Sequence, residues 1–325
     1  MNVTNVAVLR GGPSTEYDVS MQTGAGVLNA LADSKIKTKD IVISRNGDWL
    51  LDGFHKTPEH ALFGVDVVFI ALHGEYGEDG TVQRLLDRFC IPYTGTGAYA
   101  SAIAMNKELT KDHLKDSGIK TARHMRITRK GVTDASQTAR NINELFGTKY
   151  IVKPTFGGSS IGTKIANNPH ELGVVIADLL KDHDDLMVEE YVTGKEATVG
   201  ILENYRDKEL YDLPVIEIVP PAGSDFFEAD VKYSGTTEEI CPGRFGKEEK
   251  ETLAKAAQLV HQTLNLRHYS RSDFIVSDDG IYFLEVNTLP GLTAESLFPK
   301  SIEAVGGSYT DLVQHLIEQA AVSGV

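Results

Sequence analysis

Four polar residues near the C-terminal end of the chain have types and spacing that could hold a metal ion beside a charged substrate: Arg271, Asp273, Glu285 and Asn287. They flank a Ser-Asp-Asp-Gly turn between two apolar runs, a pattern typical of a β-hairpin. A three-residue loop that ends at Gly280, with this glycine in the left-handed region, predicts that the two carboxylates lie opposite each other. Because opposed carboxylates repel, we expect a cation between them, and carboxylate and amide oxygens suit Mg²⁺ or Mn²⁺. The alternative is a surface hairpin with solvated charges.

The same register assigns the two faces of the predicted hairpin. One face carries the polar residues, and the other carries an apolar set that needs a core. The arginine lies beside the carboxylates, where a guanidinium suits a charged oxygen. The turn Thr-Leu-Pro-Gly-Leu-Thr that follows could present backbone N–H groups to an anion. The apolar face is predicted to consist of Phe274, Val276, Tyr282, Leu284 and Val286.

Length, composition and charge limit the classes of protein to which the chain can belong. It has 325 residues, of which 41% are hydrophobic and 24% charged, as expected for a globular protein of two or three domains. A net charge of −14 and the lack of a Lys- or Arg-rich run argue against nucleic acid or an anionic membrane as the main partner. Two cysteines outside any CxxC pair, no signal peptide and no long apolar run indicate a cytoplasmic protein.

Two glycine-rich loops each follow a predicted strand in the first third of the chain. Residues 3–9 form the first strand, and the loop after it contains Glu16 and lacks the GxGxxG dinucleotide pattern. Residues 66–72 form a buried strand, and His73 follows it directly. Glu16 is either a first-turn acid that favours a helix dipole or a ligand-binding carboxylate at the end of the strand. His73 is either a packed histidine or a site residue.

The middle of the chain supplies lysines and a different glycine loop. Residues 98–118 are predicted to form a helix that carries Lys107 and Lys111, although lone helix lysines are usually solvated. Lys153 lies in a predicted strand at 150–154, and the Gly-Gly-Ser-Ser-Ile-Gly segment after it joins strand to strand. That segment is not a P-loop, but its N–H groups and hydroxyls could fold over phosphates.

Two carboxylates in strands and one long polar segment complete the candidate sites. Glu189 and Glu196 lie in otherwise apolar strands, so they either face solvent or accept hydrogen bonds from a ligand. Residues 225–242 are polar and have little periodicity, which is typical of a functional or disordered loop. Amphipathic helices are predicted over 247–264 and 311–321.

Four segments, taken in order, resemble the D-alanine–D-alanine ligase family of the ATP-grasp superfamily. They are GGPSTEYDVS at 11–20, LHGEYGEDG at 72–80, KPTFGGSSIG at 153–162 and EVNTLPGLTAESL at 285–297. The resemblance covers nearly the whole chain and implies an α/β, three-domain ATP-grasp fold in which two α+β domains clamp ATP. The implied parts are an N-terminal open parallel-sheet domain over 1–97, a central domain over 98–191, and a C-terminal domain over 192–325 with a lid loop over 225–242.

The resemblance also implies roles for residues around the first substrate. Glu16 resembles the acid near the ammonium group of the first D-alanine. The family links this acid to a loop serine, here Ser159 or Ser160, and to a lid tyrosine that matches Tyr233. The network would latch the closed state. Lys232 completes the lid pair, so the polar segment is expected to close over the site.

Further matches concern the reacting groups and the second substrate. His73 resembles the histidine that contacts the first D-alanine. Arg271 and the N–H of Gly291 resemble an oxyanion hole, and Ser296 and Leu297 resemble the groups that hold the carboxylate of the second D-alanine. The implied metal ligands, for two Mg²⁺ ions or Mn²⁺, are Asp273, Glu285 and Asn287. The implied ATP-binding residues are Lys107 and Lys153 for the phosphates, Glu189 and Glu196 for adenine and ribose, and the backbone of Glu190 and Val192 for the adenine edge.

The implied reaction is the ATP-dependent ligation of two D-alanines through an acyl phosphate, for peptidoglycan precursor synthesis. The group that removes the amine proton is left open between His73 and the phosphate of the intermediate. The partners are then the small molecules ATP and D-alanine, and a homodimer is an arrangement that the resemblance allows. The alternatives are a ligase that joins D-alanine to D-lactate or D-serine, against which Tyr233 argues, and a catalytically silent nucleotide-binding protein.

Two positions and one turn length depart from the family pattern. Asn106 replaces the usual aspartate before Lys107, and Ile275 replaces the second phenylalanine of the usual RxDFF. The hairpin turn between Asp273 and Glu285 is also one residue shorter than is usual. The opposed-carboxylate register is therefore a local inference from this sequence.

Overall fold

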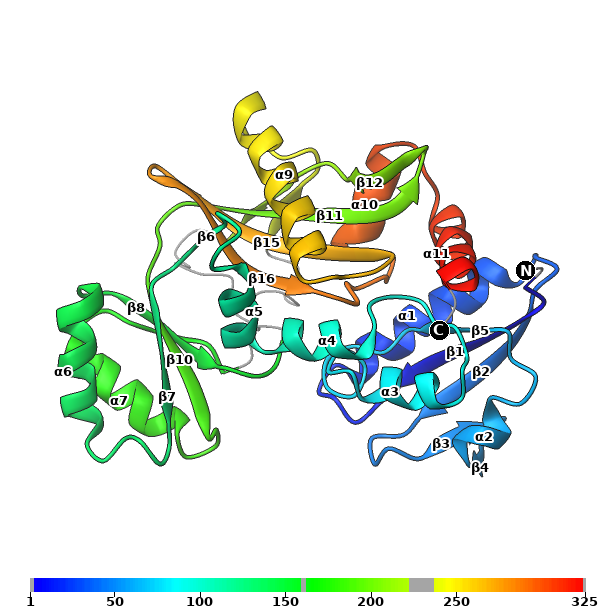
Figure 1. Ribbon diagram of the computed structural model, residues 1–325, viewed down its shortest axis with the longest axis horizontal. Coiled ribbons are helices and arrows are strands. Elements are labelled where there is room, and N and C mark those ends of the chain that lie inside the picture. The colour runs from blue at the N-terminus through cyan, green and yellow to red at the C-terminus, as the bar shows by residue number, and fades with distance from the viewer. Residues whose placement is uncertain (1–2, 159–161, 222–236, 324–325) are drawn as a thin grey trace.

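Three β-sheets, each with its own helices, make up the molecule (Figure 1). The computed structural model describes residues 3–158, 162–221 and 237–323. In Figure 1 the N-terminal sheet lies at the lower right, the middle sheet at the left, and the third sheet above and between them. Within the described ranges no helix is both long enough and apolar enough to cross a bilayer. The predicted α/β class is confirmed.

The N-terminal sheet is parallel in its centre and antiparallel at one edge. Its strand order is β4-β3-β2-β1-β5, and β1 pairs in parallel with both β2 and β5. The apolar run that predicted a buried strand forms β5, which is buried throughout. Two short antiparallel strands, β3 and β4, extend the sheet beyond its predicted parallel part. The elements are β1 (Asn5–Gly11), α1 (Tyr17–Leu31), β2 (Lys37–Ile43), β3 (Trp49–Leu51), β4 (Phe54–Lys56), α2 (Pro58–Ala61), β5 (Val67–Ile70) and α3 (Thr81–Arg88).

The middle sheet is antiparallel, with strand order β7-β10-β8-β9, and α6 and α7 share its core. Both helices begin at side-chain caps, because Asp134 and Asn168 accept hydrogen bonds from backbone N–H groups of the first turns. Strands β8 and β9 pair as the hairpin that was predicted to carry the glycine loop. The elements are β7 (His124–Thr128), α6 (Ala135–Phe146), β8 (Tyr150–Pro154), β9 (Lys164–Ala166), α7 (Pro169–Leu179) and β10 (Asp185–Glu190).

The third sheet is the largest and has the order β14-β13-β11-β15-β16-β6, with β12 paired to β11. Helix α9, which ends one residue before its predicted end, buries Leu253, Ala257 and Val260 against this sheet. The elements are β6 (Lys120–Thr121), β11 (Lys195–Tyr205), β12 (Lys208–Asp212), β13 (Ile216–Val219), β14 (Glu238–Ile240), α9 (Lys247–Thr263), β15 (Tyr269–Ser277), β16 (Gly280–Asn287) and α10 (Leu297–Ala304).

The β15–β16 hairpin has the predicted pairing at the end away from its turn, but its turn is shorter than predicted and one strand contains a bulge. Asp273 lies opposite Glu285, as expected. The turn is one residue shorter than predicted, since Ser277 pairs with Gly280. A β-bulge after Asp273, which leaves Leu284 of β16 without a partner in the pairing, restores the register.

The bulge also changes which side chains face the core. Phe283, which was not predicted to face the core, lies opposite Phe274 and packs with it in the core of the third sheet, with ring centroids 5.9 Å apart. Leu284 lines a pocket instead. The predicted places of Tyr282 and Leu284 on the core face were therefore wrong, whereas Val286, beyond the bulge, keeps its predicted place.

The segment 98–118, predicted as one helix, forms two. Helix α4 (Ala98–Met105) ends and α5 (Lys107–Leu114) begins at Asn106, whose side chain accepts hydrogen bonds from two backbone N–H groups of α5. Asn106 also forms an isolated β-bridge with Phe156. The helix break thus places the start of α5 beside the glycine loop.

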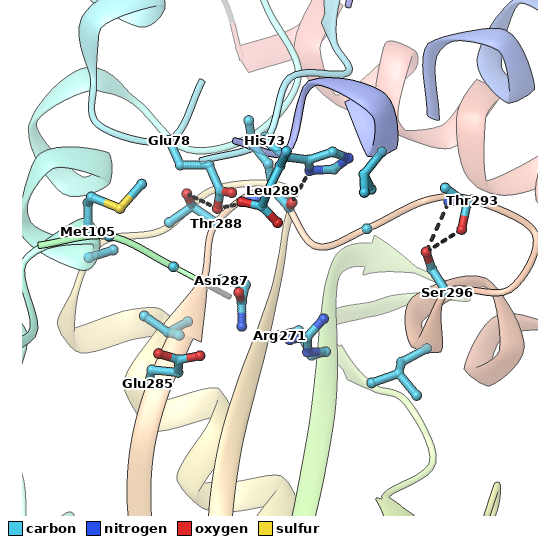
Figure 2. Close-up of a pocket in the computed structure, with 18 of the residues that line it drawn as sticks. His73, Glu78, Met105, Arg271, Glu285, Asn287, Thr288, Leu289, Thr293 and Ser296 are labelled. Carbon is cyan, nitrogen blue, oxygen red and sulfur yellow. Dashed lines mark hydrogen bonds between the residues drawn. The ribbon is translucent and has the colours of Figure 1, made fainter. Parts of the chain in front are cut away.

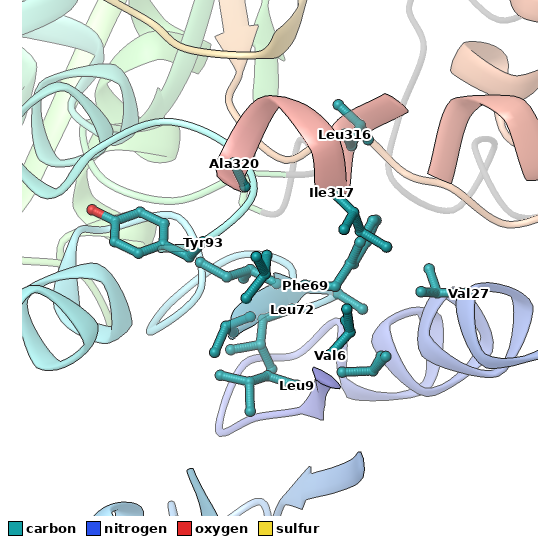
Figure 3. Close-up of a cluster of buried hydrophobic side chains, with 14 of the residues drawn as sticks. Val6, Leu9, Val27, Phe69, Leu72, Tyr93, Leu316, Ile317 and Ala320 are labelled. Carbon is teal, nitrogen blue, oxygen red and sulfur yellow. The ribbon is translucent and has the colours of Figure 1, made fainter. Parts of the chain in front are cut away.

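Helix α11 (Tyr309–Ser323) packs against the N-terminal unit, where Leu316 and Ile317 join a core that contains Val6 and Phe69 (Figure 3). Two elements of the predicted central range also belong to the third sheet: β6 pairs with β16, and Leu114 of α5 lies in the core of that sheet. The packing therefore crosses the predicted domain ranges at two places, and those ranges stay a prediction.

Candidate active site

Two pockets beside the third sheet contain most of the described residues that were predicted to form the site. The larger, of about 570 Å³, lies between the N-terminal unit and the third sheet (Figure 2). The smaller, of about 230 Å³, lies between the middle and third sheets. Predicted residues that line the larger pocket are Glu16, His73, Lys107, Arg271, Glu285, Asn287, Gly291, Ser296 and Leu297. Those that line the smaller pocket are Glu189, Glu190, Val192 and Glu196.

Part of the predicted site lies outside the described residues. The predicted lid over 225–242 is described only from residue 237 onward, where β14 pairs with β13. The roles predicted for the lid pair and for the loop serine therefore stay predictions. The predicted site residues outside the described ranges are Ser159, Ser160, Lys232 and Tyr233.

The predicted metal ligands lie together on the β15–β16 hairpin. Nδ2 of Asn287 donates to Oδ2 of Asp273 at 3.1 Å, and Glu285 is the cross-strand partner of Asp273. Within the described ranges no group of three or more His, Cys, Asp or Glu side chains is arranged to hold a metal ion. The predicted set offers two carboxylates and one amide. Such a set fits Mg²⁺ or Mn²⁺, which fill their other positions with water and phosphate oxygens.

Arg271 is a fixed cation beside this set. Its Nε and Nη2 donate to the two carboxylate oxygens of Asp273, each at 3.1 Å. Burial opposes the charge of the guanidinium, but the Asp273 carboxylate raises the pKa of Arg271 above its usual value. The side chain also lines the larger pocket, so its positive charge is available to a ligand there.

His73 is buried and has both ring nitrogens in hydrogen bonds. Nε2 lies 2.8 Å from the hydroxyl of Thr23, and Nδ1 lies 3.0 Å from the carbonyl oxygen of Leu289. A carbonyl can only accept, so Nδ1 carries the hydrogen. Burial lowers the pKa of His73, although the nearby Glu16 opposes this. The ring is therefore neutral, and it joins the N-terminal unit to the loop after β16.

Glu78 is a functional candidate that the sequence prediction missed (Figure 2). One carboxylate oxygen accepts from the N–H of Gly74 at 2.9 Å, and the other accepts from the N–H of Leu289 at 3.0 Å and the hydroxyl of Thr288 at 3.3 Å. Burial, followed by the charge of Glu16, raises the pKa of Glu78 to about 7 despite these bonds. Its position in the glycine-rich loop after β5 was the signal available in the sequence.

The raised pKa of Glu78 predicts a pH-dependent stability. The folded carboxyl binds its proton more tightly than the unfolded one, so its contribution is present at low pH and is lost as the pH rises through about 7. Between about pH 5 and pH 8 we expect the free energy of unfolding to fall by on the order of 2 kcal/mol more in the wild type than in Glu78→Gln, measured by chemical denaturation. Glu75→Gln changes an exposed carboxyl of the same loop and should follow the wild type. Identical pH profiles for the wild type and Glu78→Gln would contradict this prediction.

Three units of the fold meet around Glu16 and Lys107. A Cβ atom on Gly74, whose φ is +69°, would lie 2.9 Å from Oε2 of Glu16, and a Cβ on Gly158 would lie 3.9 Å from the same atom. The ammonium group of Lys107 donates to a carbonyl of the glycine loop and lies 3.9 Å from Oε2 of Glu285. The described part of the glycine loop therefore reaches the larger pocket, as expected for a loop that covers phosphates.

The buried carboxylate of Glu189 binds two lysines. Lys111 donates to one of its oxygens, and Nζ of Lys153 lies 2.7 Å from the other. Burial alone would raise the pKa of Glu189, but the two ammonium groups lower it to about 2. A lone lysine on a helix is usually solvated, but Lys111 is buried. Lys153 and Glu189 were predicted to contact different parts of ATP, and in the structure they contact each other.

The smaller pocket combines an apolar surface with a polar rim. Ile275 and Leu284 line it from the third sheet, and Glu196 lies opposite Ile275 in the β11–β15 pairing. The N–H of Glu190 already donates to the carbonyl of Arg123 at 3.0 Å, so only its carbonyl can serve as a backbone contact for a ligand. Apolar walls with a few polar groups at the rim suit a flat aromatic base.

The far end of the larger pocket suits a carboxylate. Oγ of Ser296 accepts from the N–H of Thr293 at 3.1 Å, and a Cβ on Gly291 would lie only 2.8 Å from the same Oγ. Ser296 immediately precedes α10, so the unpaired N–H groups and positive dipole of this helix begin beside it. Lys300 of α10 lines the same end.

Comparisons with known proteins agree with this geometry. The model of the D-ala D-ala ligase N-terminus matches residues 52–96, and that of the D-ala D-ala ligase C-terminus matches residues 113–318. A D-alanine–D-alanine ligase from Geobacter sulfurreducens is 37% identical over 323 residues, which cover 98% of this chain and 95% of that protein.

Solved structures resemble the whole chain as well. The VanG D-Ala:D-Ser ligase from Enterococcus faecalis has a TM-score of 0.83 at 28% identity, with 98% of this chain and 100% of that one covered. A D-alanine–D-alanine ligase from Bacillus anthracis complexed with ATP has a TM-score of 0.81 at 30% identity, with 99% and 98% covered. The predicted ATP-grasp fold is thereby confirmed. Since family models, a full-length relative and the arrangement of the two pockets agree, the chain belongs to the D-alanine–D-alanine ligase family.

Proposed function

We propose that the chain ligates two D-alanine molecules to D-alanyl-D-alanine, converts ATP to ADP and phosphate, and thereby supplies a precursor for peptidoglycan synthesis. The larger pocket carries this proposal, because Glu16 and His73 of the N-terminal unit line it together with Arg271 and Glu285 of the third sheet. Carboxylates and a guanidinium around one cavity suit a zwitterionic amino acid and a phosphate group. The D-alanine–D-alanine ligase of Geobacter sulfurreducens, to which the chain is similar, supports the substrate class.

ATP would lie with its base in the smaller pocket and its phosphates toward Lys107 and the larger pocket. The apolar side chains of Ile275 and Leu284 support the place of the base, and the ATP complex of the Bacillus anthracis relative supports the nucleotide. The carboxylates of Asp273 and Glu285, with the amide of Asn287, would hold the divalent cations. When bound, such ions neutralise charge on the phosphates and polarise the phosphorus.

The first step makes one D-alanine reactive. An oxygen of its carboxylate attacks the terminal phosphorus of ATP, the bond from that phosphorus to the bridging oxygen of ADP breaks, and an acyl phosphate forms. Glu16 would hold the ammonium group of this D-alanine, and Lys107 and Lys153 would offset the charge of the phosphates. The glycine loop would help to exclude water, which otherwise hydrolyses the intermediate.

The second step forms the peptide bond. The amine of the second D-alanine attacks the acyl carbon, Arg271 and the N–H of Gly291 would stabilise the oxyanion, and phosphate leaves. His73 is poorly suited as the base, because both ring nitrogens are in hydrogen bonds and its pKa is lowered. We therefore assign the amine proton to the phosphate of the intermediate.

One observation favours a second candidate, a D-alanine–D-serine ligase: the similarity to the VanG D-Ala:D-Ser ligase at 28% identity. The higher identity of the Geobacter relative, 37%, supports D-alanine as the second substrate. A catalytically silent protein would have no need to keep Arg271 bound to Asp273 beside Glu285, so the intact set supports catalysis.

Phosphate release tests the proposal. ATP and Mg²⁺ are supplied with D-alanine alone, with D-alanine plus D-serine, and with D-alanine plus D-lactate, across neutral and alkaline pH, and products are identified by mass spectrometry. We expect D-alanyl-D-alanine to be the main product in every mixture. A dominant mixed product at neutral pH would favour another second substrate, and ATP binding without phosphate release would favour the silent protein.

A further inference from the structure

The buried cluster around Glu189 contains two ammonium groups for one carboxylate. Lys111 extends from α5, Lys153 from β8 and Glu189 from β10, so the cluster joins α5 to the middle sheet. The side chains of Lys111 and Glu189 are only 2% and 3% exposed. Burial lowers the pKa of Lys111, and the Glu189 carboxylate opposes this shift. Lys111 also lies 3.4 Å from the carbonyl oxygen of Ala122.

The two lysines differ in what they can reach. Lys153 is the lysine proposed to bind ATP phosphates, and in the structure its ammonium group lies 2.7 Å from an oxygen of Glu189. A buried carboxylate left without a cation is strongly disfavoured, so Lys153 can leave only if another cation stays. Lys111 contacts the other oxygen of Glu189, and its side chain is only 2% exposed, compared with 10% for Lys153. Neither lysine lines the larger or the smaller pocket, so Lys153, the more exposed of the two, is the one with more freedom to reach a bound nucleotide.

We propose that Lys111 is a positioning residue: it keeps Glu189 paired when Lys153 turns to the nucleotide, and so makes Lys153 available to the phosphates. The inference rests on the proposed ATP site. In it Lys111 affects the nucleotide only indirectly, through Glu189 and Lys153, and does not contact ATP itself. It differs from a purely structural role, in which Lys111 only ties α5 to the middle sheet. In that case its loss would lower the free energy of unfolding but would leave the affinity for ADP unchanged.

A double-mutant cycle read by nucleotide binding separates the two roles. ADP affinity is measured by calorimetry, without amino-acid substrate, for the wild type, Lys111→Met, Glu189→Gln and the double variant. We expect Lys111→Met to weaken ADP binding at least about tenfold, because Glu189 then retains Lys153. In the Glu189→Gln background the same replacement should change ADP affinity by less than about twofold, since no carboxylate holds the lysine.

Controls keep the test independent of folding. Lys164→Met removes an exposed ion pair of 2.7 Å with Asp178 in the same unit and should leave ADP affinity unchanged. Lys111→Arg keeps the charge and should retain ADP affinity within about threefold. If Lys111→Met does not fold, ADP affinity is compared between Glu189→Gln and the double variant, neither of which buries an unpaired carboxylate. A tenfold difference in ADP affinity between these two variants overturns the proposal.

Three other results would also overturn the proposal. They are an unchanged ADP affinity in Lys111→Met, an equal loss in both backgrounds, and a loss for adenosine, which has no phosphates, as large as the loss for ADP. The readout is also separate from the ligase reaction. The expected cycle stands even if the phosphate-release assay identifies a different product, whereas failure of the wild type to bind ADP would reject the nucleotide site and the role of Lys111 together.

Discussion

Arg271→Ala is expected to lower kcat for dipeptide formation by about 10²–10³-fold, the usual effect of removing one oxyanion donor. In the structure the guanidinium is only 15% exposed, contacts both oxygens of Asp273 and lines the larger pocket. Its loss removes a fixed cation from the site where the tetrahedral oxyanion would form. ADP affinity should change by less than about threefold, because Arg271 does not line the smaller pocket, where the base would bind, and ADP lacks the phosphate that is transferred. Rapid-quench turnover and calorimetry measure the two quantities.

Two variants make the Arg271 experiment specific. Arg129→Ala removes an exposed arginine that pairs with Asp184 at 3.1 Å, and it should keep full activity. Arg271→Lys keeps the charge but loses the two-pronged contact with Asp273, so an intermediate loss is expected. A normal kcat with a raised KM for D-alanine in Arg271→Ala would show that the arginine binds substrate without stabilising the oxyanion.

The hairpin shows how far local pattern can predict a site. Period-two alternation and turn residues correctly placed Asp273 opposite Glu285. Two errors cancelled on the way, since the turn is one residue shorter and a bulge adds one residue back. A bulge is not visible in alternation, because it depends on how the strand twists in its sheet. Because the bulge was not predicted, Tyr282 and Leu284 were assigned to the wrong face of the hairpin.

Contacts between distant parts of the chain were beyond local pattern. Motif resemblance named Glu16, His73 and Arg271, which line one pocket as expected. It did not find the bond of Glu78 to Leu289, which lies 211 residues away, or that of Lys111 to Glu189, 78 residues away. These pairs form only when the units pack together, and a carboxylate or lysine in an ordinary loop or helix gives no sign of its partner.

Helix boundaries could likewise be predicted where local pattern determines them, and not where a distant contact does. The α9 stripe predicted its helix almost to the residue, because an amphipathic helix needs only one buried face. The break at Asn106 was missed because the residue can continue a helix as well as cap one, and its contact with the glycine loop region decides between them. The packing of α11 on the N-terminal unit likewise depends on chain topology that periodicity does not contain.

Glu285→Gln is expected to reduce turnover by at least about 100-fold, or about 2.7 kcal/mol in transition-state free energy. The replacement keeps the size of the side chain and removes one of the two carboxylates of the predicted metal set, Asp273 and Glu285, which lie opposite each other. The remaining oxygens belong to Asp273, whose charge is shared with Arg271, and to the amide of Asn287. Mn²⁺ affinity measured by electron paramagnetic resonance, in the presence of ADP, should fall at least about tenfold with the loss of turnover.

Glu295→Gln is the matched control for this prediction. Glu295 lines the same pocket, but its side chain is 91% exposed and lies 3.6 Å from Lys300, at the end assigned to the second substrate. It should leave Mn²⁺ affinity and the Mg²⁺ dependence of turnover unchanged. Because Glu285 also lies 3.9 Å from Lys107, a loss of turnover alone could reflect a displaced lysine. The metal assignment therefore depends on the Mn²⁺ measurement: an unchanged affinity in Glu285→Gln would remove Glu285 from the ligand set, whatever the effect on turnover.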